Sequence, residues 1–242
     1  MQQSLIPLAV HTVYRPQGYV HKLIESLFCS DYINEYKGIL HLYIGCKNST
    51  WLSQYSESSF ICLHKMDEEE CVGLDEEHRN IRFNKKYIQC IRELGEHDRG
   101  ILVAEDDIIF RSNWYHCLLD TIDEMQTKGF KDYVLSCYYG DGVALSRLGR
   151  TVWAYYPHSF FGTQLVYYQR MPGEEFANYL HAGIKNPRPT DLKLSEFCTI
   201  NANLYATNRS LVQHIGDISI DAHPAHRAYN FHLPWQEAED EK

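Results

Sequence analysis

Residues 101–110 read ILVAEDDIIF, and this stretch decides the fold that we expect. Four apolar residues lead into three consecutive carboxylates, Glu105, Asp106 and Asp107, and three apolar residues follow them. A short, wholly apolar run rich in β-branched residues predicts a strand buried on both faces, as in a parallel sheet. Open α/β sheets bind their ligands in crevices at the carboxyl ends of such strands. The three acids are therefore candidates for a binding site.

Three adjacent carboxylates favour a metal ion. An ionised carboxylate is buried only with a partner, and mutual repulsion raises the pKa values of neighbouring acids unless a cation lies among them. Oxygen ligands favour Mg²⁺ or Mn²⁺ over zinc, and such an ion completes its shell with water and substrate phosphates. The sequence thus predicts a divalent-metal site that holds a diphosphate. A solvated loop at the end of the strand is the alternative.

The composition predicts a single α/β domain for this chain of 242 residues. Its net charge of −9 argues against a broad electrostatic contact with nucleic acid or an anionic membrane, although a local basic groove stays possible. No apolar stretch approaches the roughly 20 residues of a membrane span, so we expect no membrane anchor. The eight cysteines include no C-x-x-C pair, which argues against a structural zinc site and indicates reduced thiols in a cytoplasmic protein.

Strands and helices are expected to alternate along the chain. The pattern predicts strands at 5–13, 39–44 and 60–63, with helices at 20–29, shortly after residue 48 and at 79–94. A strand, a helix and a strand in that order predict a βαβ unit with parallel strands. After the acids we expect a helix over 113–125, strands over 133–137 and 165–168, and a helix from about Thr190 to Phe197.

Two charged segments precede the central strand. Residues 67–77 hold seven acids, and we expect a solvated loop there and not a metal site. The helix at 79–94 begins with the cations Arg79, Arg82, Lys85 and Lys86. These cations either balance the acidic loop or help to hold a diphosphate.

Three positions in the second half of the chain each allow two interpretations. Gly162, within Phe161-Gly-Thr-Gln164, either permits close approach of the backbone to a ligand or forms a bulge. Thr190 or Asp191 suits the N-cap of a helix, and a capping acid such as Asp191 can also face a cleft. His214 lies between apolar residues, a setting typical of a core histidine and compatible with a metal ligand.

The order of three motifs resembles that of GT-A glycosyltransferases. The motifs are Glu105-Asp-Asp107 after a buried strand, Phe161-Gly-Thr-Gln164, and Val212-Gln-His-Ile-Gly216. Over residues 5–220 the chain looks most similar to the N-acetylglucosaminyltransferase IV-like group. This resemblance implies a GT-A, Rossmann-like fold with a mixed, mainly parallel sheet flanked by helices, in one domain over 1–235. Residues 1–110 would bind the nucleotide-sugar, 111–235 would bind the acceptor, and 236–242 would be a disordered acidic tail.

The resemblance also implies roles for individual residues. Asp107 would bind Mn²⁺ or Mg²⁺, His214 would complete the metal shell, and Glu105 would lie near the metal or the donor ribose. Asp191 would be the catalytic base, with Glu196 as the alternative. The remaining residues that we expect to bind the donor are His11, Thr12 and Arg15 near the nucleotide base, Arg79, Arg82 and Lys86 near the diphosphate, Asp106, and Gly162 and Thr163 beside the sugar.

The implied function is transfer of a sugar from a nucleotide-sugar to a hydroxyl acceptor, and a UDP-sugar is the expected donor. The resemblance implies inversion, and the sequence leaves retention open as the alternative. The metal would neutralise charge on the departing diphosphate, while Asp191 took the proton of the acceptor. Two alternatives are a nucleotide-sugar hydrolase, with water as the acceptor, and a non-catalytic carbohydrate-binding protein on the same fold. The acceptor is open among glycan, lipid, protein and nucleobase, and the acidic net charge counts against nucleic acid.

Overall fold

The central strands are apolar on both faces, and this determines the layers of the fold. The computed structural model describes residues 5–66, 77–140, 143–156, 159–216, 227–228 and 231. Strand β1 (Leu8–Thr12) is buried along its whole length, and its neighbour β4 (Ile101–Glu105) is buried as far as Ala104. Alternate residues of both strands enter two apolar clusters, one on each face of the sheet. Such strands need a cover of helices on both sides.

Nine strands in the described part of the chain form one sheet in the order β3-β2-β1-β4-β9-β6-β10-β8-β7. Strand β9 is antiparallel to both β4 and β6, β8 is antiparallel to β7 and β10, and the remaining neighbours are parallel. All of these strands except β8 and β9 therefore run in one direction, and the sheet is mixed and mainly parallel, as predicted. The strands not yet given are β2 (Leu40–Ile44), β3 (Ile61–His64), β6 (Tyr133–Ser136), β7 (Leu145–Arg147), β8 (Val152–Tyr155), β9 (Leu165–Tyr168) and β10 (Asn203–Thr207).

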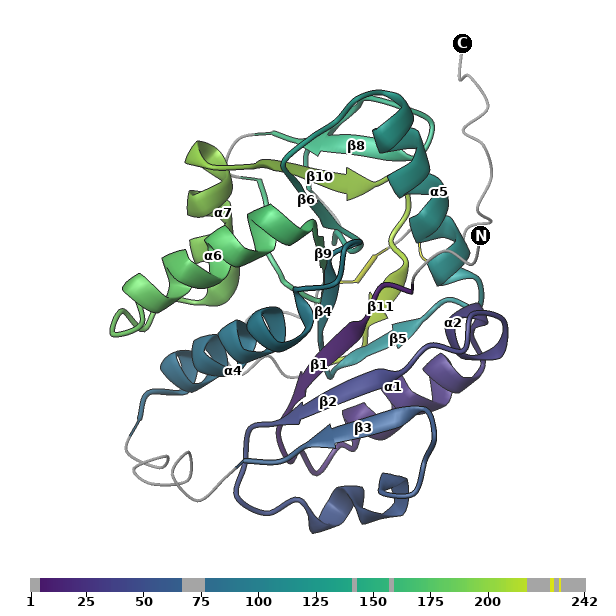
Figure 1. Cartoon of the computed structure of the whole chain (residues 1–242), viewed down its shortest axis with the longest axis vertical. Helices are drawn as coiled ribbons and strands as arrows, with labels where there is room; N and C mark the ends of the chain where they lie inside the picture. Colours follow the sequence, from purple (N-terminus) through teal and green to yellow (C-terminus); the bar gives the residue numbers. More distant parts are fainter. Residues whose placement is uncertain are drawn as a thin grey trace.

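Helices cover both faces (Figure 1). Helices α4 (Arg79–Leu94), α6 (Arg170–Ala182) and α7 (Thr190–Ile200) pack into the cluster on one face. Helices α1 (Tyr19–Phe28), α2 (Asp31–Asn34) and α5 (Trp114–Thr127) pack into the cluster on the other. A 3₁₀ helix, η1 (Thr50–Tyr55), joins β2 to β3. No helix in the described ranges is long and apolar enough to cross a membrane.

The predicted elements agree with the structure in kind, and several more exist. The βαβ prediction is confirmed, because β1 and β2 on either side of α1 are parallel. Helix α6 was not predicted, since Pro172 and Gly173 break its apolar pattern; a proline in the first turn of a helix is nevertheless tolerated. Helix α2 and strands β7, β8 and β10 were also missed. The predictions for residues 67–76 and 236–242 lie outside the described residues.

A second, smaller sheet begins directly after the three acids. Strand β5 (Ile108–Phe110) leaves the main sheet and pairs antiparallel with β11 (Val212–His214). In this register His214 lies opposite Ile108. The chain therefore changes sheets at Asp106 and Asp107, and the change brings a histidine from the end of the chain beside them.

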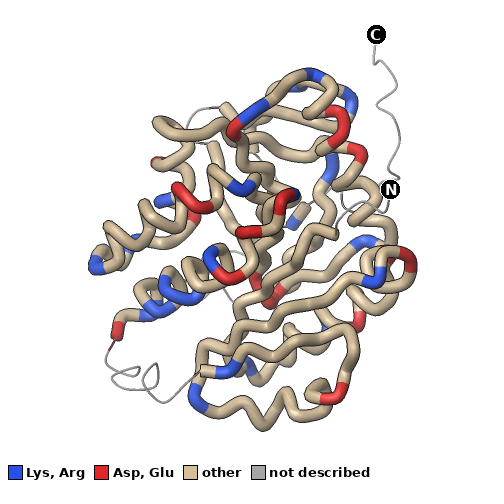
Figure 2. Tube along the Cα trace, viewed as in Figure 1, with Lys and Arg blue, Asp and Glu red and all other residues tan. Residues whose placement is uncertain are grey.

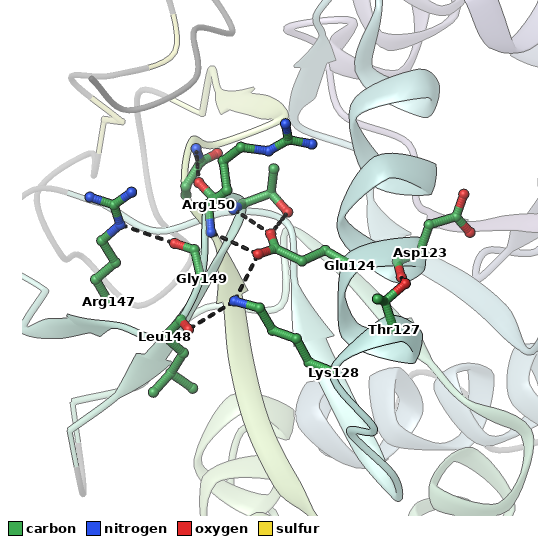
Figure 3. A network of polar contacts seen from close by, with 10 residues as sticks. Asp123, Glu124, Thr127, Lys128, Arg147, Leu148, Gly149 and Arg150 are labelled. Carbon is green, nitrogen blue, oxygen red and sulfur yellow. Dashed lines mark hydrogen bonds and ion pairs between the residues drawn. The ribbon is translucent and has the colours of Figure 1, made fainter. Parts of the chain in front are cut away.

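Glu124 of α5 hydrogen-bonds to the segment between strands β7 and β8, at the edge of the sheet, and so links it to the helix (Figure 3). One carboxylate oxygen accepts from the backbone N–H of Arg150 at 2.8 Å and from Lys128 Nζ at 2.9 Å. The other accepts from the backbone N–H of Thr151 at 2.7 Å and from its hydroxyl at 2.6 Å. Although burial opposes ionisation, the hydrogen bonds from Thr151 and Lys128 lower the pKa of Glu124 to about 2.

We expect Glu124→Gln to lower the free energy of unfolding at pH 7 by about 2 kcal/mol, because hydrogen bonds to a charged acceptor are lost. The pKa is depressed in the folded state, so the contribution of Glu124 is complete above the ordinary value of 4.5 and is lost as pH falls toward about 2. Urea titrations of both proteins should therefore converge at low pH. Glu175→Gln, on the exposed side of α6, is the control. Equal stability of Glu124→Gln and wild type at pH 7 would contradict this role.

Candidate active site at the end of the central strand

The pairing of β1 with β4 places the end of one strand beside the acids that end the other. His11 is the register partner of Glu105, so the next residues, Thr12 and Asp106, come side by side. The hydroxyl of Thr12 donates to Asp106 Oδ2 at 2.8 Å, and the backbone N–H of Val13 donates to the same oxygen at 3.4 Å. Asp106 is thus held by the loop that follows β1.

Arg15 provides the positive charge among the acids. Its Nη2 lies 3.1 Å from Asp106 Oδ1, and its Nη1 donates to Asp107 Oδ2 at 2.7 Å. Asp106 and Asp107 are only 2% and 6% exposed, so an unpaired charge on either would be costly. One guanidinium faces two buried carboxylates, with Glu105 next to them, and this leaves negative charge without compensation.

The pKa values reflect this surplus. Burial raises the pKa of Glu105 to about 7, and the charge of Asp107 adds to this shift. The hydroxyl of Thr163 donates to Glu105 Oε1 at 2.7 Å, and this hydrogen bond acts in the opposite direction. Burial raises the pKa of Asp106 to about 6, although Arg15 opposes the shift. For Asp107 burial acts in the same direction, but the hydrogen bond with His214 and the charge of Arg15 hold its pKa below the ordinary value. An additional cation would favour the ionised form of all three.

Asp107 and His214 form the part of the site best suited to a metal ion. His214 Nε2 lies 3.4 Å from Asp107 Oδ2, and the backbone N–H of Ile215 donates to the carbonyl of Asp107 at 2.8 Å. The second carboxylate oxygen, Asp107 Oδ1, is buried and has no hydrogen-bond partner among the described residues. Buried polar atoms normally have partners. A carboxylate oxygen and an imidazole nitrogen fit Mn²⁺, and a carboxylate with water and phosphate oxygens fits Mg²⁺.

Gly216 closes one side of this pair. A Cβ atom at position 216 would lie 2.7 Å from His214 Nε2 and 3.0 Å from Asp107 Oδ2, so only glycine fits there without displacing them. Glu105 stands apart from the pair: in the described part of the chain, Glu105, Asp107 and His214 do not form a set whose ligand atoms all lie within 4.8 Å of one another.

The loop before β9 brings Asp191 to the same end of the sheet. Gly162 has a φ of 87°, which favours glycine, and its N–H donates to Asp191 Oδ2 at 3.1 Å. The backbone N–H of Leu192 donates to Asp191 Oδ1 at 2.7 Å. The predicted capping role is wrong, because Pro189 occupies the N-cap of α7 and no side chain caps the helix. Asp191 instead lies in the first turn, where the helix dipole favours its negative charge.

Other residues predicted for the site have different surroundings. Glu196 is half exposed on α7, and its carboxylate accepts from Arg188 Nη1 at 2.9 Å. His11 is buried edge-on against Phe83, with ring centroids 4.9 Å apart. Its burial, with the charges of Lys86 and Arg15, lowers its pKa to about 3. His11 is therefore neutral and packed between β1 and α4.

The predicted cations Arg79, Arg82 and Lys86 lie along α4, where Lys and Arg recur on the chain trace (Figure 2). Arg79 is exposed, Arg82 is half-buried, and Lys86 is buried with its Nζ donating to Gln89 Oε1 at 2.9 Å. Sequence analysis named Arg15 and Gly216 but missed what they do: Arg15 bridges Asp106 and Asp107, and Gly216 packs against His214 and Asp107. The role of Arg15 depends on the parallel register of β1 and β4, for which the sequence holds no local signal.

Comparisons with known proteins identify solved structures with a similar fold. No family model matches the chain, and no curated protein matches its sequence. Among solved structures, S. aureus TarS 1–349 is 12% identical over 86% of this chain and 60% of that one, with a TM-score of 0.52. GalNAc-T7 with UDP, GalNAc and Mn²⁺ is 11% identical over 88% of this chain and 44% of that one, with a TM-score of 0.56.

The chain therefore spans less than two thirds of the length of each of these two structures. TarS 1–349 also has a structure in complex with UDP, with a TM-score of 0.50 to this chain and 12% identity over 86% of this chain and 60% of that one. At this level of identity the likeness establishes the fold, and the fold is GT-A, as expected from the sequence.

We expect Gly216→Ala to weaken Mn²⁺ binding by roughly tenfold or more, in line with changes to groups that support a ligand. The added methyl would displace His214 Nε2 or the Asp107 carboxylate. Isothermal titration calorimetry measures the change. Gly183→Ala is a matched control, because its nearest neighbour would be the carbonyl oxygen of Tyr179 at 3.6 Å. Unchanged Mn²⁺ affinity in a folded Gly216→Ala protein would rule out this pair as the metal site.

The raised pKa of Glu105 predicts a pH dependence of stability without metal. An acid whose folded pKa is raised from 4.5 to about 7 costs stability as pH rises between these values. Glu105→Gln should remove that fall and make the metal-free protein more stable than wild type above pH 7. Chemical denaturation in the presence of a chelator measures this. The exposed Glu57→Gln should keep the wild-type slope, and an equal slope in Glu105→Gln would refute the predicted shift.

Proposed function

We propose that this protein is a metal-dependent glycosyltransferase that moves a sugar from a UDP-sugar to a hydroxyl acceptor with inversion. The observation that carries the proposal is the buried, unpartnered Asp107 Oδ1 beside His214, at the carboxyl end of the central strand. The GT-A fold supports it, as does the presence of UDP and Mn²⁺ in the structure of GalNAc-T7, which has a similar fold. The finer likeness to the N-acetylglucosaminyltransferase IV-like group is part of this proposal.

Asp107 and His214 would hold Mn²⁺ or Mg²⁺, with Glu105 near the metal or the donor ribose. When bound, the ion supplies positive charge that stabilises the departing diphosphate. Arg15 keeps Asp107 oriented and ionised through its 2.7 Å contact, and the hydroxyl of Thr12 orients Asp106. The cations Arg79, Arg82 and Lys86 would add positive potential from α4. Residues 1–110 would thus form the donor half and 111–235 the acceptor half.

Asp191 is the proposed catalytic base. One of its oxygens accepts from the N–H of Gly162 and the other from the N–H of Leu192, so its carboxylate is fixed in orientation. The residue after Gly162 in the same loop, Thr163, donates its hydroxyl to Glu105, so neighbouring residues of one loop contact both carboxylates. In the proposed reaction Asp191 takes the proton of the acceptor hydroxyl while the hydroxyl oxygen attacks the anomeric carbon from the side opposite the diphosphate.

Two substitutions separate donor binding from catalysis. Asp107→Asn should abolish Mn²⁺-dependent stabilisation by UDP-sugars in a thermal-shift screen. Asp191→Asn should keep that stabilisation and slow transfer by the ~10² to 10⁴ typical of losing a general base. Transfer is measured as UDP release with a panel of glycosides, lipids and peptides as acceptors.

Each result has a defined consequence. Release of UDP at the same rate with and without any acceptor would favour a nucleotide-sugar hydrolase. Absence of release from every donor that binds would favour a carbohydrate-binding protein. Near wild-type transfer by Asp191→Asn together with loss in Glu196→Gln would move the role of the base to Glu196.

A further inference from the structure

Two histidines and a cysteine meet on the edge strands of the sheet. His41 lies on β2, and Cys62 and His64 lie on β3, at the edge of the main sheet (Figure 1). His41 is the register partner of Cys62, and His64 follows Cys62 by two positions, so all three share one face. One ligand atom from each residue lies within 4.8 Å of those of the other two.

The distances between these atoms suit a small tetrahedral ion. His41 Nδ1 and His64 Nε2 are 3.0 Å apart. Zinc bound at about 2.0–2.1 Å to nitrogen and about 2.3 Å to sulfur places its ligand atoms roughly 3.3–3.7 Å from one another. The two nitrogens would therefore move apart by a few tenths of an ångström to admit the ion. One sulfur and two imidazole nitrogens form the ligand set of zinc sites, whereas Mg²⁺ and Mn²⁺ prefer oxygen.

A carboxylate supports His64 from its other side. His64 Nδ1 lies 3.5 Å from Glu93 Oε2 of α4, and the hydroxyl of Tyr43 donates to the same oxygen at 2.9 Å. The ring of Tyr43 stacks on His64, with centroids 4.1 Å apart and planes at 10°. Metal-bound histidines typically donate their second N–H to a carboxylate, which turns the remaining nitrogen toward the ion. His64 Nδ1 faces Glu93 at a distance longer than a hydrogen bond of this kind, and Nε2 is directed at His41.

His41 Nδ1 and His64 Nε2 share one hydrogen bond, so an ion that binds both nitrogens would displace the proton between them. Burial, with the nearby His64 and His97, lowers the pKa of His41 to about 4. Burial also lowers the pKa of His64, although Glu93 opposes the shift. Metal binding needs neutral imidazole and ionised thiol. Cys62 is exposed, so an ion can reach its thiol from solvent.

We propose that His41, Cys62 and His64 bind one zinc ion, with water in the fourth position and Glu93 as the positioning residue of His64. The site is distinct from the acidic one, because His41 is near the amino end of β2 and the acids follow the carboxyl end of β4. The ion would join the edge strand β3 to β2 and, through Glu93, to α4. The lack of a C-x-x-C pair does not exclude it, since its ligands come from neighbouring strands.

Cobalt is the probe for this site, because Co²⁺ replaces zinc and its bond to a thiolate absorbs in the near ultraviolet. The full-length, metal-stripped protein should bind one equivalent of Co²⁺ with this absorption, and zinc should displace it. Cys62→Ser should lose the absorption, and His64→Gln should weaken zinc binding at least tenfold in a dye competition. Glu93→Gln should weaken zinc binding by about 10- to 100-fold. Cys29→Ser, an exposed cysteine elsewhere, and Asp107→Asn, in the acidic site, should change neither signal.

Circular dichroism and thermal melting of the metal-free variants show whether each one folds. Zinc should raise the melting temperature of wild type and not that of Cys62→Ser. Thiolate absorption that persists in Cys62→Ser would overturn the proposal, and so would zinc binding that is lost in Asp107→Asn alone. If Cys62→Ser or His64→Gln fails to fold, Glu93→Gln decides: an unchanged zinc affinity in that variant contradicts the site.

Discussion

The contact of Arg15 with Asp106 and Asp107 is the interaction on which this end of the molecule depends. Two neighbouring carboxylates, 2% and 6% exposed, cannot both be ionised in the protein interior without a cation. Arg15 reaches them only because β1 runs parallel to β4 in a register that sets Thr12 beside Asp106. The parallel pairing, the loop after β1 and the acids therefore form one unit. Without the positive charge of Arg15, the two buried carboxylates would repel each other if both were ionised.

After β4 the chain passes from the main sheet to the small sheet, and this step brings a second group of residues to the site. The chain leaves a strand buried on both faces and enters β5, which pairs with β11 and so brings His214 to Asp107. Gly216 and Gly162 then permit approaches that a side chain would block, at His214 in one case and at Gln164 in the other. Backbone geometry, as well as the acids, thus defines which groups meet. A site with surplus negative charge and an unpartnered carboxylate oxygen is prepared for a cation.

The sequence alone predicted the elements whose structure is determined by residues close to one another in the chain. The buried strand at 101–104 and its acidic end follow from composition, and helix α4 begins and ends where its apolar stripe predicts, at Arg79 and Leu94. Elements that contradict local rules were missed, such as α6 with Pro172 and Gly173 in its first turns. The capping prediction for Asp191 failed because a proline took the N-cap and left the acid free to accept from Gly162.

Long-range pairings were beyond local patterns. That Arg15 bridges two acids more than ninety residues away depends on strand register, which periodicity does not encode. The sequence analysis assigned His214 to the site only through the resemblance to a family, because its apolar neighbours are equally typical of a core histidine. His41, Cys62 and His64 look unrelated in the sequence, and they meet only because β2 and β3 pair in one register. The spacing of these three residues along the sequence therefore gives no signal for this kind of metal site.

The central claim is that the acids at the end of β4 bind a divalent metal together with a nucleotide diphosphate. Crystals grown with Mn²⁺ and UDP, measured near the manganese absorption edge, test it most directly. The account predicts an anomalous peak at bonding distance from an oxygen of Asp107 and from His214 Nε2, with diphosphate oxygens on its open side. A structure with UDP bound elsewhere, or with Arg15 still on Asp107 and no manganese beside it, would contradict the account.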